Sequence, residues 1–184
     1  MARLPYLDED DLPEEERDLL SRPINLFRQL VHSPGAARAM HTMGHLIRYD
    51  SRLDPRLREI AILTVGYLAR APYEYSHHAK IGQDFGVSKQ DIRCVARYLE
   101  GEAASELSDV DRLVIDCARQ LTEGHAVEDE TYHQLEEVHS PEELVDLVTT
   151  IAFYNGVVRV LGAFQIDVEP DYQPYLDEFP LPRE

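Results

Sequence analysis

The chain has 184 residues, the size of one domain, and 43% of them are hydrophobic, which is enough to form a buried core. Its 18 basic residues against 35 acidic ones give a formal net charge of -17, which repels phosphate backbones and anionic lipids, so we expect neither nucleic acid nor a membrane as partner. No stretch has the unbroken apolar run of a signal peptide or membrane span, so we expect a cytoplasmic protein.

Apolar residues recur at spacings of three and four through most of the chain, which predicts an all-α fold. Asp54-Pro55 and Ser140-Pro141 are typical helix starts, and Gly86 is suited to a helix end. We expect a bundle of about eight or nine helices in a single domain over residues 1–168. The predicted helices cover 13–21, 24–31, 34–49, 55–70, 73–85, 89–99, 109–123, 128–138 and 141–165.

Residues 169–184 differ in composition from the rest of the chain. Pro170, Pro174, Pro180 and Pro182 lie there among acidic and aromatic residues. Because proline disfavours a continuing helix, we expect an extended, acidic, proline-rich tail that lies on this subunit or on a neighbour.

Cys94 and Cys117 lie far apart on separate predicted helices. This spacing is typical of reduced helix residues and not of a disulfide framework or a metal knuckle.

Glu59 is a carboxylate in an apolar setting, since its neighbours three, four and seven residues onward are Ile62, Leu63 and Gly66. One interpretation is an ion pair with Arg56 near the start of the helix. The other is a carboxyl group in a low-dielectric site, where desolvation makes it a better acid at neutral pH.

The next predicted helix places Glu74, His77, His78, Ile81 and Phe85 on one face. Glu74 and His78 are four residues apart and point where the large apolar side chains point, so a carboxylate lies within reach of an imidazole. Such a pair can transfer protons, and it can equally be a buried, hydrogen-bonded structural pair.

His41 and His45 are also four residues apart, which raises metal binding as a third possibility. A zinc helix of the familiar kind has glutamate directly after its first histidine, but Thr42 follows His41. The pattern therefore favours an ordinary surface or core pair, and we assign no metal ligand and no cofactor.

Asn155 and Arg159 are four residues apart in an apolar helix. An inward-pointing Arg159 can hold a substrate carboxylate in a bidentate pair, or it can pair structurally with an acidic residue, including one across a subunit interface. Tyr67, Tyr73 and Tyr75 are candidates to line the same cavity, although aromatic residues at helical spacing are usually core.

The segment from Leu53 to Ile92 resembles the carboxymuconolactone decarboxylase and alkylhydroperoxidase D-like family. Its marks are R-x-x-E-x-x-x-L from Arg56 to Leu63, Y-E-x-x-x-H from Tyr73 to His78, and the F-G-V-S turn from Phe85. Weaker agreement extends from the turn at residues 32–34 to the helix with residues 154–155. The resemblance implies an all-helical fold and a homo-oligomer, usually a trimer or hexamer.

One branch of that family reduces peroxides through a C-x-x-C pair flanked by a glutamate and a histidine that relay protons. Aligned on Glu59 and His78, the two cysteines fall on Ala71 and Glu74, so this chain lacks both thiols. It therefore looks more like the decarboxylase branch than like a thiol peroxidase.

The function we expect is a cofactor-free lyase or isomerase that moves protons on a small, anionic organic acid or lactone. His78 would be the general acid/base, Glu74 would orient it and balance its charge, and Glu59 would be the second proton carrier. Arg159, Asn155, Tyr67 and Tyr73 are the candidate substrate-binding residues. Two alternatives remain open: a non-catalytic helical oligomer with a structural or ligand-binding cluster, and a metal-dependent enzyme at the same cluster.

Overall fold

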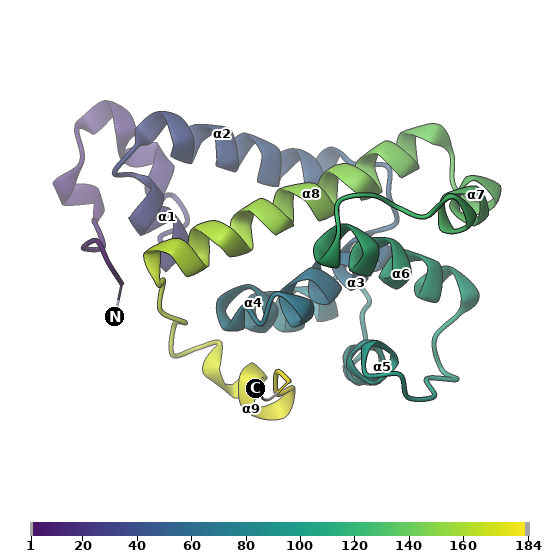
Figure 1. The fold of residues 1–184 in the computed structure, drawn as a ribbon. Helices are drawn as coiled ribbons and strands as arrows, with labels where there is room; N and C mark the ends of the chain where they lie inside the picture. The colour runs from purple at the N-terminus through teal and green to yellow at the C-terminus, as the bar shows by residue number, and fades with distance from the viewer. Residues whose placement is uncertain (1, 183–184) are drawn as a thin grey trace.

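The protein is entirely helical over residues 2–182, the part of the chain that the computed structural model describes (Figure 1). Within these residues nine α-helices, two 3-10 helices and one π-helical segment form a single domain without a β-strand, which confirms the expected all-α class. The elements are η1 Glu9–Asp11, η2 Glu14–Leu20, α1 Asn25–Leu30, α2 Pro34–His45, η3 Leu46–Asp50, α3 Pro55–Leu68, α4 Pro72–Asp84, α5 Lys89–Leu99, α6 Asp109–Glu123, α7 Asp129–Val138, α8 Pro141–Phe164 and α9 Gln173–Glu178.

Helix α3 lies at the centre of the bundle. It begins after Asp54, whose side chain accepts hydrogen bonds from the backbone N–H groups of Arg56 and Leu57. Every residue from Arg58 to Tyr67 is buried, because α3 contacts α4, α5, α6 and α8. A polar side chain on this stretch of α3 is therefore a core residue and needs a partner.

Helix α4 crosses α3 at very close range. The closest approach is at Gly66, where an added Cβ would lie 3.2 Å from the backbone N and Cα of Tyr75. A glycine at this position allows the two helices to approach and brings the start of α3 beside the middle of α4.

Helix α8 lies across the bundle between α2 and α6 (Figure 1). It is the one described helix whose length and composition would suffice to cross a membrane, and 50% of its most apolar window is buried inside the protein. Ser140 and Glu143 form a capping box at its start. Its inner face belongs to the core around α3.

The N-terminal third departs from the predicted helices in two places. The segment expected as a helix over 13–21 is the 3-10 helix η2, and the helix expected over 34–49 is α-helical only to His45. It continues as the π-helical turn η3, in which the N–H of Ser51 donates to the carbonyl of Leu46 at 2.9 Å. Helix periodicity in the sequence does not distinguish these tighter and wider turns from an α-helix.

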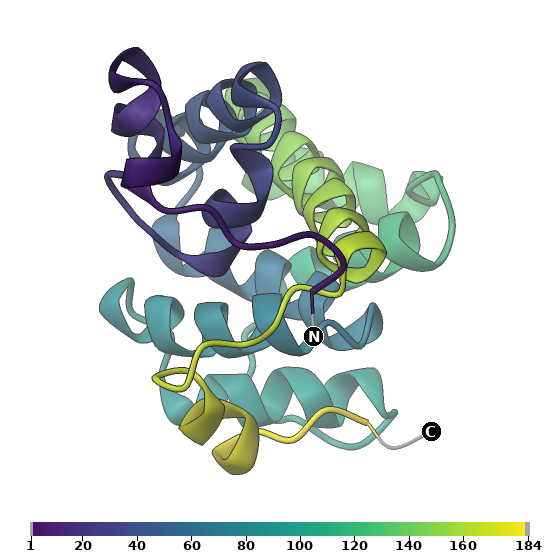
Figure 2. The same ribbon diagram turned by 90° about the vertical axis from the view of Figure 1, so that its left-hand side faces the viewer.

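The tail expected to be extended contains a helix. Pro174 lies in the first turn of α9, where proline is tolerated because its missing N–H has no helical partner. Helix α9 packs on α4, and the connection to it from α8 crosses the same side of the molecule (Figure 2). Residues 183–184, at the end of the predicted tail, lie outside the described residues.

Candidate active site

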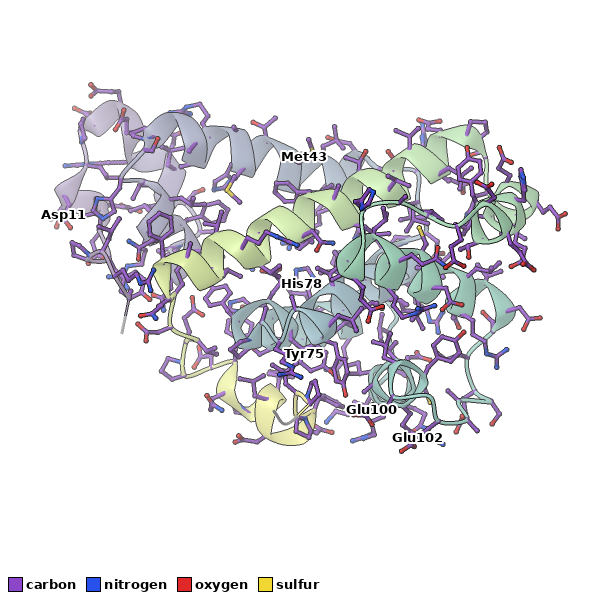
Figure 3. All side chains as sticks on the ribbon, in the orientation of Figure 1. Asp11, Met43, Tyr75, His78, Glu100 and Glu102 are labelled. Atoms are coloured by element: carbon purple, nitrogen blue, oxygen red, sulfur yellow. The ribbon has the colours of Figure 1, made fainter. Side chains whose placement is uncertain are left out.

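Glu59, Glu74 and His78 form one hydrogen-bonded row at the contact of α3 and α4, and His78 lies near the middle of the molecule (Figure 3). Nδ1 of His78 lies 2.6 Å from Oε2 of Glu59, and Nε2 lies 2.9 Å from Oε1 of Glu74. All three residues are at most 5% exposed. Both ring nitrogens of His78 are therefore engaged by carboxylates, an arrangement that can pass a proton along the row.

Arg58 completes the row at its inner end. Its Nε donates to Oε1 of Glu59 at 3.0 Å, and its Nη1 donates to the backbone carbonyl of Arg48 at 3.0 Å. Of the two interpretations of Glu59, the ion pair with Arg56 is wrong, because the Arg56 guanidinium is turned toward the carboxylates of Asp111 and Asp91.

The charges in the row stabilise one another. Burial by itself would raise the pKa of Glu59, but the adjacent His78 and then Arg58 hold that pKa below its ordinary value. Burial would likewise lower the pKa of His78, but Glu59 and then Glu74 hold it above its ordinary value. These shifts favour an imidazolium between two carboxylates.

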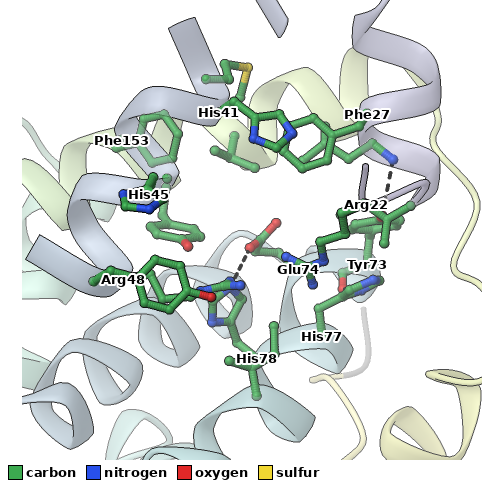
Figure 4. Close-up of a pocket in the computed structure, with 18 residues that line it drawn as sticks. Arg22, Phe27, His41, His45, Arg48, Tyr73, Glu74, His77, His78 and Phe153 are labelled. Atoms are coloured by element: carbon green, nitrogen blue, oxygen red, sulfur yellow. Dashed lines mark hydrogen bonds and ion pairs between the residues drawn. The ribbon is translucent and has the colours of Figure 1, made fainter. Parts of the chain in front are cut away.

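A cavity of about 220 Å³ opens on one end of this row (Figure 4). Glu74 and His78 line it, whereas Glu59 and Arg58 lie behind His78 and do not. Figure 4 places the Glu74 carboxylate in the middle of the cavity, between Arg48 and Arg22. The other walls come from α1 and the residue before it, α2, η3, α4 and α8. They carry Ile24, Leu26, Phe27, Met40, His41, Gly44, His45, Tyr49, Tyr73, His77, Ile81, Phe153, Tyr154 and Val157.

The predicted substrate-binding residues do not all lie at this cavity. Tyr73 lines it, but the Tyr67 hydroxyl donates to Oε1 of Glu100 at 2.6 Å on another side of α3. Asn155 and Arg159 line a separate depression beside the ends of α3 and α6. There the Arg159 guanidinium donates to the backbone carbonyl and to Oδ1 of Asn155. Since α8 presents Tyr154 toward His78, the adjacent Asn155 points to a different side of the helix.

The sequence analysis missed several cavity residues, among them Arg48, Arg22 and Tyr154. Arg48 is seven residues after His41, a spacing that puts both on one helical side, and this signal could have found it. Arg22 lies in a loop before Pro23 and has no periodic signal. The ring of Tyr154 meets that of His78 edge-on, with centroids 5.0 Å apart, and burial, followed by Glu74 and Glu59, raises the pKa of its hydroxyl.

His41 and His45 both line the cavity, but they are not arranged with other residues as metal ligands. His41 packs against Phe27 with ring centroids 4.1 Å apart, and Nδ1 of His45 lies 3.3 Å from Oδ2 of Asp50. Among residues 2–182 no three histidine, cysteine, aspartate or glutamate side chains are grouped so as to hold a metal ion.

Both cysteines are free and buried, and neither lines the cavity. Burial raises the pKa of Cys117 to about 12, and burial together with the nearby Glu106 carboxylate raises that of Cys94. Since the thiolate is the reactive form, both environments oppose thiol chemistry.

The fold and the site define an all-helical protein with a buried carboxylate–histidine–carboxylate row beside a cavity. The model of the carboxymuconolactone decarboxylase family matches residues 34–106, which include Glu59, Glu74 and His78, and this match confirms the resemblance found in the sequence. No curated protein gives a significant match to the chain.

Solved structures share the fold over nearly the whole chain. A peroxidase-related protein from Ralstonia eutropha JMP134 with an alkylhydroperoxidase AhpD core is 19% identical, with a TM-score of 0.79 and coverage of 95% of each chain. A peroxidase-related protein from Silicibacter sp. TM1040 is 18% identical, with a TM-score of 0.76 and coverage of 92% of each chain. The debrominase Bmp8, in complex with 2,3,4-tribromopyrrole, is 18% identical, with a TM-score of 0.75, and the alignment covers 97% of this chain and 100% of that one. At these identities the likeness establishes the fold.

Proposed function

We propose that this protein is a cofactor-free lyase of the decarboxylase type, or an isomerase, that moves protons on a small organic acid or lactone bound in the cavity. The observation that carries the proposal is the row from Arg58 through Glu59 and His78 to Glu74, which is buried at one end and faces the cavity at the other. A group that must exchange protons with a substrate needs this access, and a purely structural ion pair does not.

The geometry changes the order in which we expect the residues to act. Because both nitrogens of His78 already contact carboxylates, a substrate meets Glu74 first. In our proposal Glu74 exchanges the proton with the substrate, His78 restores it, and Glu59 with Arg58 stabilises the imidazolium. Such positioned proton transfer typically contributes about 10²- to 10⁴-fold in rate.

For a β-keto acid the proposed step is balanced as follows. The bond between the α-carbon and the carboxylate breaks, CO₂ leaves, and the electron pair moves into the enolate. The His78 imidazolium passes its proton to Glu74, Glu74 delivers that proton to the α-carbon, and a proton from water in the cavity then returns to His78 by way of Glu74. An isomerisation uses the same groups, with removal of a proton from one carbon and its delivery to another.

The size of the cavity supports a small ligand. Its volume of about 220 Å³ is below the ~300 to 1,000 Å³ typical of pockets for drug-sized molecules. The debrominase with a similar fold binds 2,3,4-tribromopyrrole, a small planar ring, which is consistent with a ligand of that size here.

The test is a screen of lactones, β-keto acids and enol acids in deuterated water, with CO₂ release and proton exchange followed together. Glu74→Gln keeps the shape of the side chain but cannot carry the proton, so we expect it to lower turnover about 10²- to 10⁴-fold. Glu100→Gln is the matched control, because Glu100 bonds Tyr67 away from the cavity. Equal turnover in Glu74→Gln and the wild type would show that the assignment is wrong.

The non-catalytic interpretation has its own support, because the row neutralises its charges internally and is almost completely buried. A structural network predicts that Glu74→Gln changes the free energy of unfolding while none of the acids and lactones exchanges protons with the wild-type protein.

We also propose that the chain forms a homo-oligomer through the outer side of α8. Val145, Ala152, Gly156 and Ala163 are all exposed and, at spacings of seven, four and seven residues, share one side of the helix, on which Arg159 also lies. A largely apolar exposed side is unusual in a chain with a net charge of -17. Light scattering of the wild type and Ala152→Glu tests this proposal: we expect an oligomer and a monomer, respectively.

A further inference from the structure

Two arginines in the cavity have no carboxylate partner. Arg22 and Arg48 both line it, and neither forms an ion pair with a described acidic residue. This is notable in a chain with nearly twice as many acidic as basic residues, in which Arg28, Arg38 and Arg56 each pair with an aspartate. Cations held in a cavity without a counter-ion make it a site for an anion.

The backbone presents Arg48 in an unusual way. It lies in the middle of the π-helical turn η3, where the hydrogen bond from Ser51 to Leu46 replaces the normal helical register. Arg58 donates to the carbonyl of Arg48 while it also holds Glu59. Short π-helical turns are rare and occur frequently at functional sites. The same buried guanidinium thus fixes the positions of both the proton-transfer row and Arg48.

The charge balance of the cavity leaves both arginines available. The row accounts for its own charges, because Arg58 pairs with Glu59 and the His78 imidazolium pairs with Glu74. Figure 4 places Arg48 and Arg22 on the two sides of the Glu74 carboxylate. The ionic partner that this end of the cavity lacks is therefore an anion, and it would lie next to the group that exchanges the proton.

The opposite end of the cavity is apolar and rich in rings. Figure 4 places Phe27, Phe153 and the His41 ring there, away from Glu74, and His41 packs against Phe27. Met40 and Val157 also line the cavity. Burial, followed by Arg22, lowers the pKa of His41, and its Nε2 is buried without a hydrogen-bond partner. A neutral imidazole and flat apolar walls fit a planar, unsaturated ligand body.

We propose that the cavity binds a small aromatic carboxylate, whose acid group lies against Arg48 and Arg22 and whose ring lies between Phe27 and Phe153. Arg48 is the specificity-determining residue. This inference rests on the proposed function for the identity of the site, but its test measures binding and needs no turnover.

The probes are benzoate and benzamide, which share shape and differ in charge. We expect the wild-type protein to bind benzoate more tightly than benzamide in calorimetric titrations at neutral pH. Arg48→Gln should weaken benzoate binding about 10- to 100-fold, the loss of one charge-assisted contact, and leave benzamide binding unchanged. Arg48→Lys keeps the charge but lacks the planar guanidinium. Its affinity for benzoate should therefore lie between those of the wild type and Arg48→Gln.

Two further variants test whether benzoate binds in this cavity and beside Glu74. Arg159→Gln removes an arginine from the separate depression and should leave both affinities unchanged. Glu74→Gln removes the negative charge between the two arginines and should strengthen benzoate binding, even if no substrate in the panel turns over. Equal binding of the two probes to the wild type, no benzoate binding at all, or an unchanged preference in a folded Arg48→Gln protein would each overturn the proposal.

Discussion

Nδ1 of His78 lies 2.6 Å from Oε2 of Glu59, a contact between two buried residues that are 19 positions apart in the chain. It joins α3 to α4 at the centre of the bundle and sets the protonation of the groups behind the cavity. The stability of the fold and the chemistry of the site therefore depend on the same contact.

Removal of the Glu59 charge should strongly destabilise the protein. Glu59→Gln leaves the Arg58 guanidinium buried without a counter-ion and removes one of the two carboxylates that contact His78. We therefore expect a loss of about 3 to 5 kcal/mol in the free energy of unfolding. The measurement is urea denaturation. Asp109→Asn breaks the exposed pair with Arg112 and should cost less than about 1 kcal/mol. Similar small losses in both variants would contradict the importance of the buried row.

The stability of the protein should depend on pH through the same pair. The folded-state pKa of His78 is raised, so its contribution is fully present below its ordinary value of 6.5 and is lost as the pH rises through the raised value. The pKa of Glu59 is lowered, so its contribution is fully present above 4.5 and is lost as the pH falls through the lowered value. Both contributions are fully present between pH 4.5 and 6.5.

Urea denaturation between pH 4 and pH 9 measures this dependence. His78→Gln should remove the alkaline loss of stability that belongs to this residue, and the slope for other groups should remain. If the wild type and this variant lose stability in parallel as the pH rises, the raised pKa of His78 is contradicted.

The close approach of α3 and α4 should not tolerate a methyl group at Gly66. In Gly66→Ala the Cβ would meet the backbone of Tyr75 at 3.2 Å, and backbone cannot move aside as a side chain can. We expect a loss of about 1 to 3 kcal/mol, measured by thermal or urea unfolding. Gly162→Ala is the control, because an added Cβ has no neighbour within 4 Å and should stabilise α8 by up to about 1 kcal/mol. An unchanged stability of Gly66→Ala would contradict so close an approach of α3 and α4.

Glu169 should hold the C-terminal segment against the cavity wall. Its Oε1 accepts hydrogen bonds from the backbone N–H of Asn25 at 2.7 Å and from the Tyr73 hydroxyl at 2.9 Å, and its Oε2 lies 3.3 Å from Nε2 of His77. Glu169→Ala leaves these donors unpaired, so we expect a loss of about 1 to 3 kcal/mol.

Hydrogen exchange of residues 166–179 is the direct measurement for this segment, and it should become faster in Glu169→Ala. Glu178→Ala, which removes exposed pairs with Lys89 and Arg93, is the control and should destabilise the protein much less than Glu169→Ala does. Unchanged exchange in Glu169→Ala would show that the segment is held by its apolar contacts instead.

The helices themselves could be predicted from local patterns. Apolar periodicity and caps such as Asp54 and Ser140 are encoded within a few residues, so α3 to α8 lie close to the predicted ranges. The π-helical turn after His45 and the helix α9 were not predicted, because the hydrogen-bond register of a turn and the docking of a proline-rich segment depend on contacts with distant residues.

The candidate site could be predicted only in part. The helical spacing of Glu74 and His78 is a local property, and it placed the two side chains together before any tertiary contact was known. Arg159 was assigned to the same cavity because its helix is apolar, but the direction in which a side chain leaves a helix that is buried on several sides depends on the packing around it. Arg22 was also missed, because it lies in a loop, where no helical periodicity indicates the direction of a side chain.

The sequence by itself determined the fold class, the pairing of Glu74 with His78 and the absence of a cysteine pair beside them, because each follows from residue identity and helical spacing. The tertiary structure alone decided that Arg58 and not Arg56 is the partner of Glu59, that His78 is enclosed by two carboxylates, and that Arg48 and Arg22 face the cavity. These relationships join residues on different elements. They depend on how closely α3 and α4 pack, and that distance is fixed by the whole core.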